Sequence, residues 1–276
     1  MTFSLPKKGK EKVALAIYDS KPSEEEMKLG KKPAFLTAAD IGEPFFVYTS
    51  GRVGPYYIDL RVLPSFPKNY KAILTQLIWL LDTVVGSENI DCIISTESAG
   101  ISWGQSIANY FDLPFAYARK EPKTYGTKKF IEGHIPKGAK VFNIDDLVTT
   151  LKSVKKAVEG ARAEGAEVLG SEVIFNRKQY TSKDLEELDA PLYWLIDIID
   201  FVKIGIEKHR LDKEIGSQIL TYHNNEGLYA RRVIEENIDL VKSHPKKEDI
   251  LSAYEKIYAK TKDENFGLVV KLLKKL

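Results

Sequence analysis

Several features that define whole classes of protein are scarce or missing in this sequence. Its 276 residues include a single cysteine, Cys92, which excludes a disulfide within the chain and a metal site built from clustered cysteines. The 41 Lys and Arg residues nearly balance the 39 Asp and Glu residues, so the net charge of +2 gives no overall attraction to nucleic acid. No apolar run reaches transmembrane length, and the N-terminus, MTFSLPKKGKEK, lacks the apolar stretch of a signal peptide. We therefore expect a cytoplasmic protein without a membrane or nucleic-acid partner.

The composition that remains is that of a soluble globular protein, with 43% hydrophobic and 29% charged residues. The length allows one α/β domain with an appendage, or two small domains. Residues 1–34 are a polar segment rich in Lys, Glu and Pro, in which we expect one short helix. Ser23 is the expected N-cap of that helix, and Glu26 stands at the capping-box position.

Residues 35–205 are predicted to form an α/β domain. The stretch FFVYTSGRVGPYYIDLR, residues 45–61, has two aromatic and β-branched runs around a turn signal, which predicts a hairpin. Residues 68–86 carry apolar side chains at helical spacing. Strand-like and helical patterns then alternate, with strands expected at 90–95, 115–118, 139–145, 167–175 and 192–199, and helices at 100–111 and 151–164. Such alternation predicts a mainly parallel sheet with helices on its faces.

The pattern changes near residue 200, after which no strand is predicted. Helices are expected at IEENIDLVKSH (234–244), EDILSAYEKIYAK (248–260) and NFGLVVKLLKKL (265–276). Breaks are expected at 243–245 and 262–265, where Pro and runs of small or charged residues interrupt the apolar spacing. We interpret residues 206–276 as a helical extension that packs on the core or on a partner subunit.

The stretch VFNIDDLVTTLKSV, residues 141–154, is the strongest candidate for a site. A buried strand leads into Asp145 and Asp146, and Thr149 and Thr150 precede a helix. In an open parallel sheet, ligands bind at the carboxyl ends of strands, and helix N-termini attract anions. The pattern therefore favours a ligand with sugar hydroxyls and a phosphate. The residues alone leave a second interpretation open, in which the acids cap the helix and the threonines form a turn.

Two other segments carry charges suited to an anionic substrate. The loop ARKEPKTYGTKKFIEG, residues 118–133, has a hinge candidate at Gly126 and five clustered cations: Arg119, Lys120, Lys123, Lys128 and Lys129. Flexible cations that close over a leaving pyrophosphate would stabilise its growing charge. A solvated charged loop is the alternative. In VIFNRK, residues 173–178, Arg177 could clamp a planar carboxylate, or it could be a surface residue at a strand end.

Taken together, four segments resemble those of orotate phosphoribosyltransferases, including the form found in bifunctional UMP synthases. They are TSGRVGPYYIDLR (49–61), ARKEPKTYGTKKFIEG (118–133), the acid-pair stretch (141–154) and VIFNRK (173–178). They occur in the family's order and at its spacing, across roughly residues 35–205. The resemblance implies the type I phosphoribosyltransferase fold, which is α/β with a mainly parallel twisted sheet and flanking helices. A small N-terminal hood region and the C-terminal helical extension would complete the chain.

The resemblance also implies an activity. The protein would be a transferase that converts orotate and phosphoribosyl pyrophosphate (PRPP) to orotidine 5′-monophosphate and diphosphate, in de novo pyrimidine biosynthesis. Mg²⁺ would be the cofactor, carried by PRPP and water without a direct protein ligand. A homodimer is expected, because members of the family are typically dimeric.

The residue roles follow from the matched segments. The resemblance implies catalytic roles for Asp145, Asp146 and Lys123. PRPP would be bound by the basic loop through Arg119, Lys120, Lys123, Tyr125 and Lys128, and by the acid-pair stretch through Asp145, Asp146, Leu147, Val148, Thr149, Thr150, Lys152 and Ser153. Orotate would be held by Arg177, Thr149, Tyr56 and Tyr57. For the two tyrosines, packing within the hairpin is an equally open interpretation.

The sequence departs from the family at five positions. Leu151 and Lys152 stand where glycine and a small residue usually follow the threonines. Thr49 and Ala99 stand where many relatives have Lys, and Asn176 replaces an Asp. Leu151, Ala99 and Thr49 support an alternative function as a non-catalytic PRPP-binding regulator or assembly protein. A phosphoribosyltransferase for another base is a further alternative. The full set of loop cations and Arg177 favour the orotate enzyme.

Overall fold

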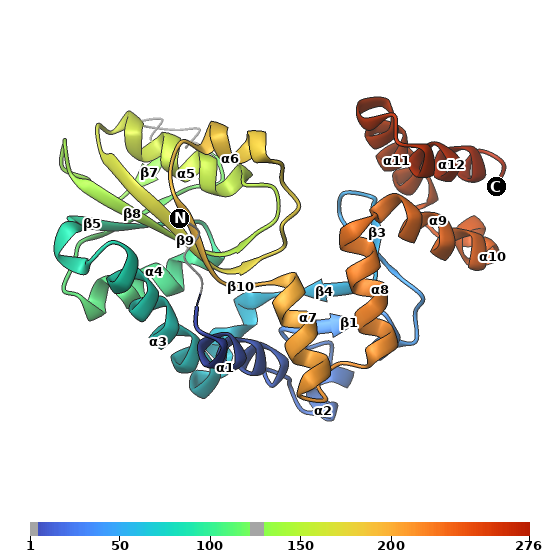
Figure 1. The fold of residues 1–276 in the computed structure, drawn as a ribbon, viewed down its shortest axis with the longest axis horizontal. Coiled ribbons are helices and arrows are strands. Elements are labelled where there is room, and N and C mark those ends of the chain that lie inside the picture. Colours follow the sequence, from blue (N-terminus) through green and yellow to red (C-terminus); the bar gives the residue numbers. More distant parts are fainter. Residues whose placement is uncertain (1–4, 122–129) are drawn as a thin grey trace. The chain divides into compact units, whose positions relative to one another are not determined.

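The computed structural model describes residues 5–121 and 130–276 and divides the chain into two units (Figure 1). The first is made of Met1–Pro22 and Leu60–Ile204, and the second of Ser23–Asp59 and Gly205–Leu276. The segment 35–59, predicted to belong with the sheet, therefore shares a unit with the C-terminal helices. The division into an N-terminal segment, a phosphoribosyltransferase domain and an extension stays a prediction.

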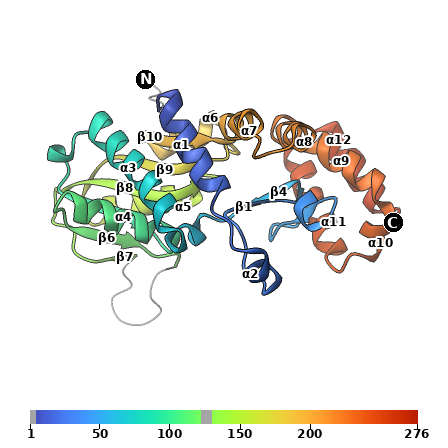
Figure 2. The same ribbon diagram turned by 90° about the horizontal axis from the view of Figure 1, so that it is seen from below.

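A six-stranded sheet forms the centre of the first unit. Its strands are β5 (Cys92–Thr96), β6 (Phe115–Ala118), β7 (Ile131–Glu132), β8 (Lys140–Val148), β9 (Glu167–Asn176) and β10 (Leu192–Asp197). Their order is β10-β9-β8-β5-β6-β7, and all neighbours are parallel except β7, which runs antiparallel to β6 at the edge. The edge strands β6 and β7 lie next to each other in Figure 2. The predicted mainly parallel sheet is confirmed; the short edge strand β7 was not foreseen.

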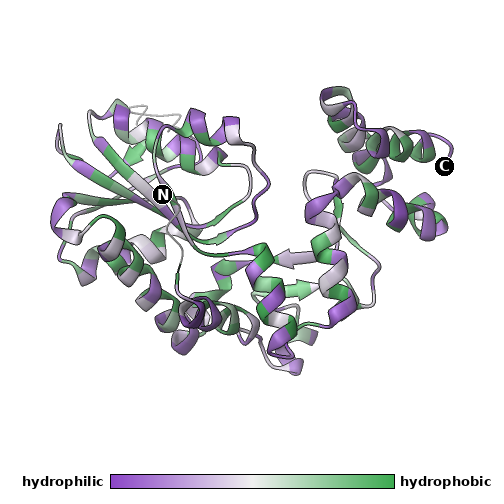
Figure 3. Ribbon diagram, in the orientation of Figure 1, coloured by the Kyte–Doolittle hydropathy of each residue, from purple (hydrophilic) through white to green (hydrophobic). Residues whose placement is uncertain are grey.

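Helices cover both faces of this sheet (Figure 1). One face carries α5 (Lys152–Ala163) and α6 (Ser182–Leu188), and the other carries α1 (Lys7–Tyr18), α3 (Pro67–Val84) and α4 (Ala99–Tyr110). The helix α7 (Ile198–Glu207) follows β10. These helices mix hydrophobic and hydrophilic residues along their length (Figure 3), because each buries one side only. In α5 the buried side consists of Val154, Ala157, Val158, Gly160 and Ala161.

The short helix predicted within residues 1–34 is present, but the expectation of only one helix there was wrong, because α1 precedes it. Lysines and a glutamate surround Val13, Ala14 and Ile17 in the sequence and hide their helical spacing. In the structure these residues are buried. At the end of α1, the ring of Tyr18 stacks on Phe201 of α7 with centroids 4.1 Å apart, and its hydroxyl donates to the Phe201 carbonyl at 3.2 Å.

The second unit contains two small antiparallel strand pairs. Its strands are β1 (Phe35–Thr37), β2 (Phe46–Val47), β3 (Val53–Gly54) and β4 (Tyr56–Ile58), with β2 paired to β3 and β1 to β4. The hairpin predicted across 45–61 is therefore confirmed only in its first half. Pro55 has no N–H to continue the ladder, and the chain beyond it pairs with β1 instead. The short helix α2 (Glu24–Lys28) begins with the predicted capping box of Ser23 and Glu26.

Helices make up the rest of the second unit. They are α8 (Lys213–Asn224), α9 (Glu226–Glu236), α10 (Ile238–Ser243), α11 (Lys247–Thr261) and α12 (Glu264–Leu273). The helix predicted at 234–244 is in fact split, because Asn237 lies between α9 and α10 and its side chain donates to the Val233 carbonyl at 2.8 Å. Both predicted breaks are confirmed. Among the described residues, no helix is long and apolar enough to cross a membrane.

Candidate active site

The acid pair lies near the carboxyl end of β8, but the strand continues past it. The prediction that this strand ends at Asp145 was wrong. Pairing with β9 persists through Leu147 and Val148, because β9 runs on to Asn176 and supplies ladder partners that far. Asp145 and Asp146 therefore belong to a rigid strand in the centre of the sheet, and their carboxyl groups are held by the sheet rather than by a loop.

The surroundings of the pair make both carboxyl groups reluctant to ionise. The Asp145 side chain is buried, and its Oδ1 accepts a hydrogen bond from the backbone N–H of Asp146 at 2.9 Å. Burial raises the pKa of Asp145 above its usual value. Burial, together with the neighbouring charge of Asp145, raises the pKa of Asp146 well above its usual value. The two acceptors stand on consecutive residues of β8, with Asp145 buried and Asp146 half-buried, and they are suited to binding hydroxyl donors or a positive charge.

The first turn of α4 approaches this pair closely, which the sequence analysis did not foresee. A Cβ atom on Gly100 would lie 2.9 Å from the Ile144 carbonyl oxygen and 3.0 Å from Oδ1 of Asp145. Only glycine allows this approach. The positive end of the helix dipole thereby comes near a buried carboxylate, which favours its charged form. The sequence does contain an indication of this close approach. Ser98-Ala99-Gly100 directly follows a predicted strand, and that strand, β5, pairs with the acid-pair strand β8.

The turn between β8 and α5 keeps a backbone conformation typical of glycine without containing one. Leu151 has φ 59° and ψ −2°, in the left-handed region. Its side chain is 1% exposed and packs in a cluster with Val148, Val154, Val158, Val173 and Leu188. The conformation costs about 1–2 kcal/mol, whereas burial of a leucine contributes about 1.5–3 kcal/mol. The buried side chain therefore offsets the backbone cost, and the path of the turn is preserved.

The start of α5 offers a further set of polar groups. Thr149 and Thr150 lie between the end of β8 and Leu151, and Lys152 and Ser153 begin the helix. Thr150 and Lys152 are exposed, and Thr149 and Ser153 are half-buried. The first N–H groups of a helix have no partner within the helix and bind anions. This end of α5 can therefore accept a phosphate.

Two of the predicted loop cations lie within the described residues. Arg119 follows β6, and its Nη1 lies 3.3 Å from Oε1 of Glu132 on β7. The backbone N–H of Lys120 donates to Oε2 of Glu97 at 3.0 Å. The other predicted loop residues, Lys123, Tyr125, Lys128 and Lys129, lie outside the described residues.

Arg177 directly follows β9, next to the end of the acid-pair strand. Its backbone N–H donates to the Val148 carbonyl at 2.9 Å. Before it, the buried Asn176 side chain donates to the Tyr180 hydroxyl at 2.7 Å and accepts from the backbone N–H of Lys178 at 2.8 Å. The amide nitrogen thus donates one of these hydrogen bonds and the amide oxygen accepts the other. Nothing in the structure explains the replacement of Asp by Asn, and Arg177 stays at the end of β9.

The predicted orotate-binding tyrosines lie in the second unit. Tyr56 is fully buried, and its hydroxyl lies 2.8 Å from Nε2 of His223 on α8. Tyr57 is half-buried, and Nζ of Lys32 lies 5.7 Å from the centre of its ring. The Tyr56 side chain is therefore part of the core of its unit, while Tyr57 keeps exposed surface.

Comparison with known proteins matches residues 66–196 to the phosphoribosyl transferase domain. An orotate phosphoribosyltransferase of Staphylothermus marinus is 34% identical over 186 residues, which are 67% of this chain and 88% of that protein. The chain belongs to the orotate phosphoribosyltransferase family. Another orotate phosphoribosyltransferase, from Lactococcus lactis subsp. cremoris, is 34% identical over 170 residues, or 61% of this chain and 80% of the relative.

Solved structures agree with this membership of the orotate phosphoribosyltransferase family. The orotate phosphoribosyltransferase of Aeropyrum pernix is 27% identical with a TM-score of 0.53, and the match covers 71% of this chain and 97% of that one. A UMP synthase of Leishmania donovani shares the fold with a TM-score of 0.63 at 22% identity, covering 79% of this chain and 43% of that one. The type I phosphoribosyltransferase fold expected from the sequence is confirmed.

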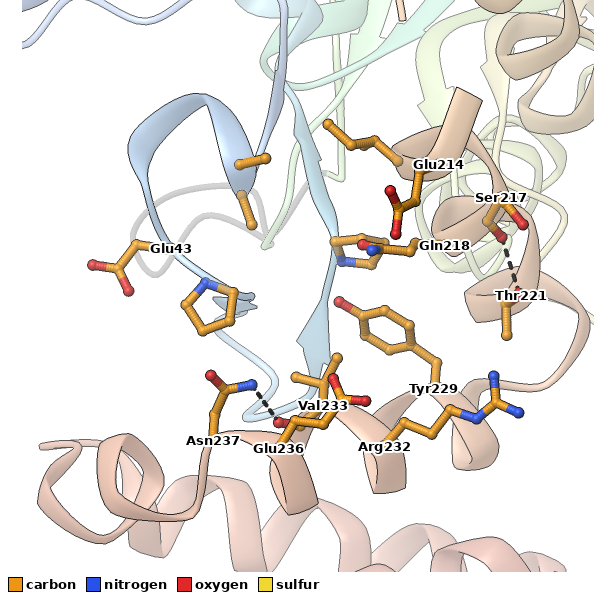
Figure 4. Close-up of a pocket in the computed structure, with 15 residues that line it drawn as sticks. Glu43, Glu214, Ser217, Gln218, Thr221, Tyr229, Arg232, Val233, Glu236 and Asn237 are labelled. Atoms are coloured by element: carbon orange, nitrogen blue, oxygen red, sulfur yellow. Dashed lines mark hydrogen bonds between the residues drawn. The ribbon is translucent and has the colours of Figure 1, made fainter. Parts of the chain in front are cut away.

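A pocket in this orotate phosphoribosyltransferase-family chain lies apart from the predicted site residues. Its volume is about 490 Å³, and it belongs to the second unit (Figure 4). Side chains of α8 and α9 line it together with residues of the 38–55 segment; they include Glu43, Glu214, Gln218, Tyr229, Arg232 and Glu236. None of the residues predicted to bind PRPP or orotate lines this pocket.

The sequence analysis also missed a buried acid on β9. Glu172 is fully buried, and neither of its carboxyl oxygens has a hydrogen-bond partner among the described residues. Burial raises its pKa well above the usual value. The alternation of EVLGSEVIF suggests a polar residue facing solvent, whereas helices cover both faces of this sheet. We assign Glu172 no role in substrate binding.

Proposed function

We propose that the protein is an orotate phosphoribosyltransferase, which transfers the phosphoribosyl group of PRPP to orotate in UMP synthesis. One observation carries the proposal beyond family membership. The acid pair, the left-handed turn at Leu151 and the N-terminus of α5 follow one another at the carboxyl end of β8. Hydroxyl acceptors and an anion site thus stand side by side, as a sugar phosphate requires.

In this reaction, nitrogen N1 of orotate forms a bond to C1 of the ribose while the bond from C1 to the diphosphate oxygen breaks. Positive charge develops on the ribose in an oxocarbenium-like transition state. We assign Asp145 and Asp146 to the 2- and 3-hydroxyls. A ribose cation beside them favours the ionised form of these carboxyl groups, and their negative charge in turn stabilises the cation. Diphosphate leaves with the electron pair of the broken bond, and the N1 proton of orotate is released.

The 5′-phosphate is assigned to the turn after β8 and the start of α5. Leu147, Val148, Thr149, Thr150, Lys152 and Ser153 line this stretch. The buried Leu151 side chain supports the assignment, because it leaves the backbone of the turn in the conformation that a glycine would give. Leu151, Ala99 and Thr49 were the support for a non-catalytic PRPP regulator, and the conformation of Leu151 is compatible with the enzyme as well.

The diphosphate is assigned to Arg119, Lys120, Lys123, Tyr125 and Lys128. Arg177 is assigned to the carboxylate of orotate, because a guanidinium can make two parallel hydrogen bonds to it. Thr149, Tyr56 and Tyr57 are proposed as further orotate contacts. A carboxylate clamp would select orotate over uracil and over purines.

Mg²⁺ is proposed as the cofactor. Among the described residues, no group of three or more His, Cys, Asp or Glu side chains is placed to hold a metal ion. This donor set fits an ion that is carried by the diphosphate of PRPP and by water, since Mg²⁺ keeps several waters and needs few protein ligands. Bound there, it neutralises charge on the diphosphate. We also propose a cytoplasmic homodimer; light scattering of the purified protein tests the dimer.

Orotate consumption, followed by its absorbance with purified protein, PRPP and Mg²⁺, tests the function. Uracil and adenine run in parallel, and an Asp145→Asn/Asp146→Asn variant is the blank. We expect turnover with orotate only, and its loss in the variant. Retained PRPP binding without turnover of any base would instead favour the regulator, and turnover of another base would reassign the substrate.

A further inference from the structure

The C-terminal helices of this protein hold the segment 48–58, which contains Tyr56 and Tyr57, through contacts far apart in the sequence. The first is a bidentate ion pair between Arg52 and Glu226, the first residue of α9. Nε of Arg52 lies 2.6 Å from Oε1 of Glu226, and its Nη2 contacts Oε2. The two side chains are 26% and 13% exposed. Arginine and carboxylate groups paired in this way fix both distance and orientation.

The second contact ties the backbone of β3 to α11. The N–H of Val53 donates to the hydroxyl of Tyr254 at 3.1 Å, and both residues are fully buried. A buried N–H that loses its partner costs about 1–3 kcal/mol. Tyr254 also stacks on Phe266 of α12, with ring centroids 5.9 Å apart. The hydroxyl that holds β3 is therefore itself held by the packing of two tail helices.

Two further contacts flank these. The hydroxyl of Tyr56 pairs with His223 on α8 at 2.8 Å. The turn at Gly51, with φ 80°, lies so close to α11 that a Cβ atom there would be 2.3 Å from the Asp249 carbonyl oxygen. The segment is thus bound to α8, α9 and α11 together.

The segment needs such support because its own hydrogen bonding is small. The strands β2 and β3 have two residues each, and a strand pair of that size is not stable alone. Within the segment, the Tyr48 hydroxyl donates to the Tyr56 carbonyl at 2.5 Å. The strand β4, at the end of the segment, pairs with β1. The side-chain contacts of Arg52, Val53 and Tyr56 described above come from the tail helices.

We propose that Glu226, Tyr254 and His223 are positioning residues, and that the helical tail sets the geometry of segment 48–58 for orotate binding. The inference rests on the proposed function, because it takes its role for the segment from the orotate contact of Tyr57. Arg52 has a structural role here. Its guanidinium is committed to Glu226, so it does not replace the lysine that relatives carry near Thr49. The tail is accordingly part of the enzyme's substrate specificity.

Steady-state kinetics of four single variants test the proposal. Glu226→Gln and Tyr254→Phe each remove one contact with little change in volume. Glu235→Gln and Tyr258→Phe are the matched controls, since they lie on the same two helices and Glu235 makes an exposed i,i+4 pair with Arg231. We expect KM for orotate to rise about tenfold in the first pair, with KM for PRPP and both controls within about twofold of the parent.

Hydrogen exchange at residues 46–58 is the second measurement, and we expect it to accelerate in the first pair alone. A charge-reversed double variant, Arg52→Glu/Glu226→Arg, should regain part of the orotate affinity lost in either single reversal. This double variant tests the positioning role through the Arg52–Glu226 contact, so the proposal remains testable if Tyr254→Phe fails to fold.

Four results would overturn the inference. Faster exchange with an unchanged KM for orotate would mean that the tail only stabilises the segment. A lower KM for PRPP in Glu226→Gln would mean that Glu226 withholds Arg52 from PRPP. A parent protein without orotate turnover would refute the proposed function itself, and the positioning role with it; an active parent with unchanged KM values would refute the positioning role alone.

Discussion

The acid-pair stretch 141–154 and the segment 48–58 are both assigned to substrate, but they are held in place in different ways. The first belongs to a central strand and to a hydrophobic cluster made largely by its own neighbours in sequence. The second depends on partners 167 to 201 residues away along the chain. The proposed ribose and phosphate site thus lies on a central strand of the sheet. The proposed orotate contacts lie on a small strand pair that the C-terminal helices hold in place.

Removing the acid pair should have the largest effect on activity while leaving the scaffold of the first region intact. In Asp145→Asn/Asp146→Asn the hydroxyl acceptors remain, but the charge that stabilises the ribose cation is lost. We expect turnover to fall by about 1,000-fold. Circular dichroism should show a folded variant. Turnover within about tenfold of the parent would show that these carboxylates are not at the reacting centre.

Substitution of Leu151 breaks the local anchor of the first region. Leu151→Ala leaves a cavity and keeps the left-handed backbone cost, so we expect a loss of about 2–5 kcal/mol in the free energy of unfolding. Leu151→Gly leaves a similar cavity but removes the backbone cost, and should be about 1 kcal/mol more stable than Leu151→Ala. Urea unfolding measures both. Glycine less stable than alanine would contradict the left-handed conformation at this position.

Arg177→Ala tests the proposed contact between Arg177 and the carboxylate of orotate. We expect kcat/KM for orotate to fall about 30-fold, because a charged hydrogen-bonding partner of the orotate carboxylate is lost, with PRPP affinity nearly unchanged.

Lys123→Ala should instead lower kcat, because it acts on charge that develops in the transition state. Equal loss of PRPP binding in both variants, measured by calorimetry, would contradict the two roles.

The smallest effect concerns stability and pH. The folded-state pKa of Glu172 lies above its unfolded value, so the folded protein holds the extra proton in the pH window between the two. Its contribution to stability is therefore greatest below the unfolded pKa and is lost as pH rises through that window. Glu172→Gln should flatten the dependence of unfolding free energy on pH above about 4.5. Glu167→Gln, on the same strand but exposed, is the control; an equal change in both would assign the dependence elsewhere.

The parts of the molecule that could be predicted from the sequence are those governed by local pattern. The strands β5, β6 and β9 and the acid pair were correctly placed, because buried parallel strands are short apolar runs with polar residues at their ends. Local pattern also located the capping box at Ser23. The spacing of the residues left two interpretations of the acid pair open. The resemblance to a family favoured the proposed role in binding the ribose.

What the sequence could not show depends on distant partners. The continuation of β8 beyond Asp145 follows from the length of β9, and Pro55 separates β4 from the hairpin only because β1 is available to pair with it. Arg52 and Glu226 are 174 positions apart in the sequence. The residues around each of them give no indication that the two side chains pair. The hydrogen bonds that the Asn176 side chain makes with the Tyr180 hydroxyl and the Lys178 N–H are likewise seen only in the structure.

Because Leu151 occupies the turn, the conformation of the turn depends on the packing of the hydrophobic cluster. A glycine there would leave the two independent. With glycine in the turn, residues of the nearby hydrophobic cluster could change without disturbing the turn itself. Here the side chain that holds the turn is also a member of that cluster. A substitution at Val158 or Leu188 that loosens the cluster is therefore expected to alter the affinity for phosphate as well, although neither residue is assigned to substrate.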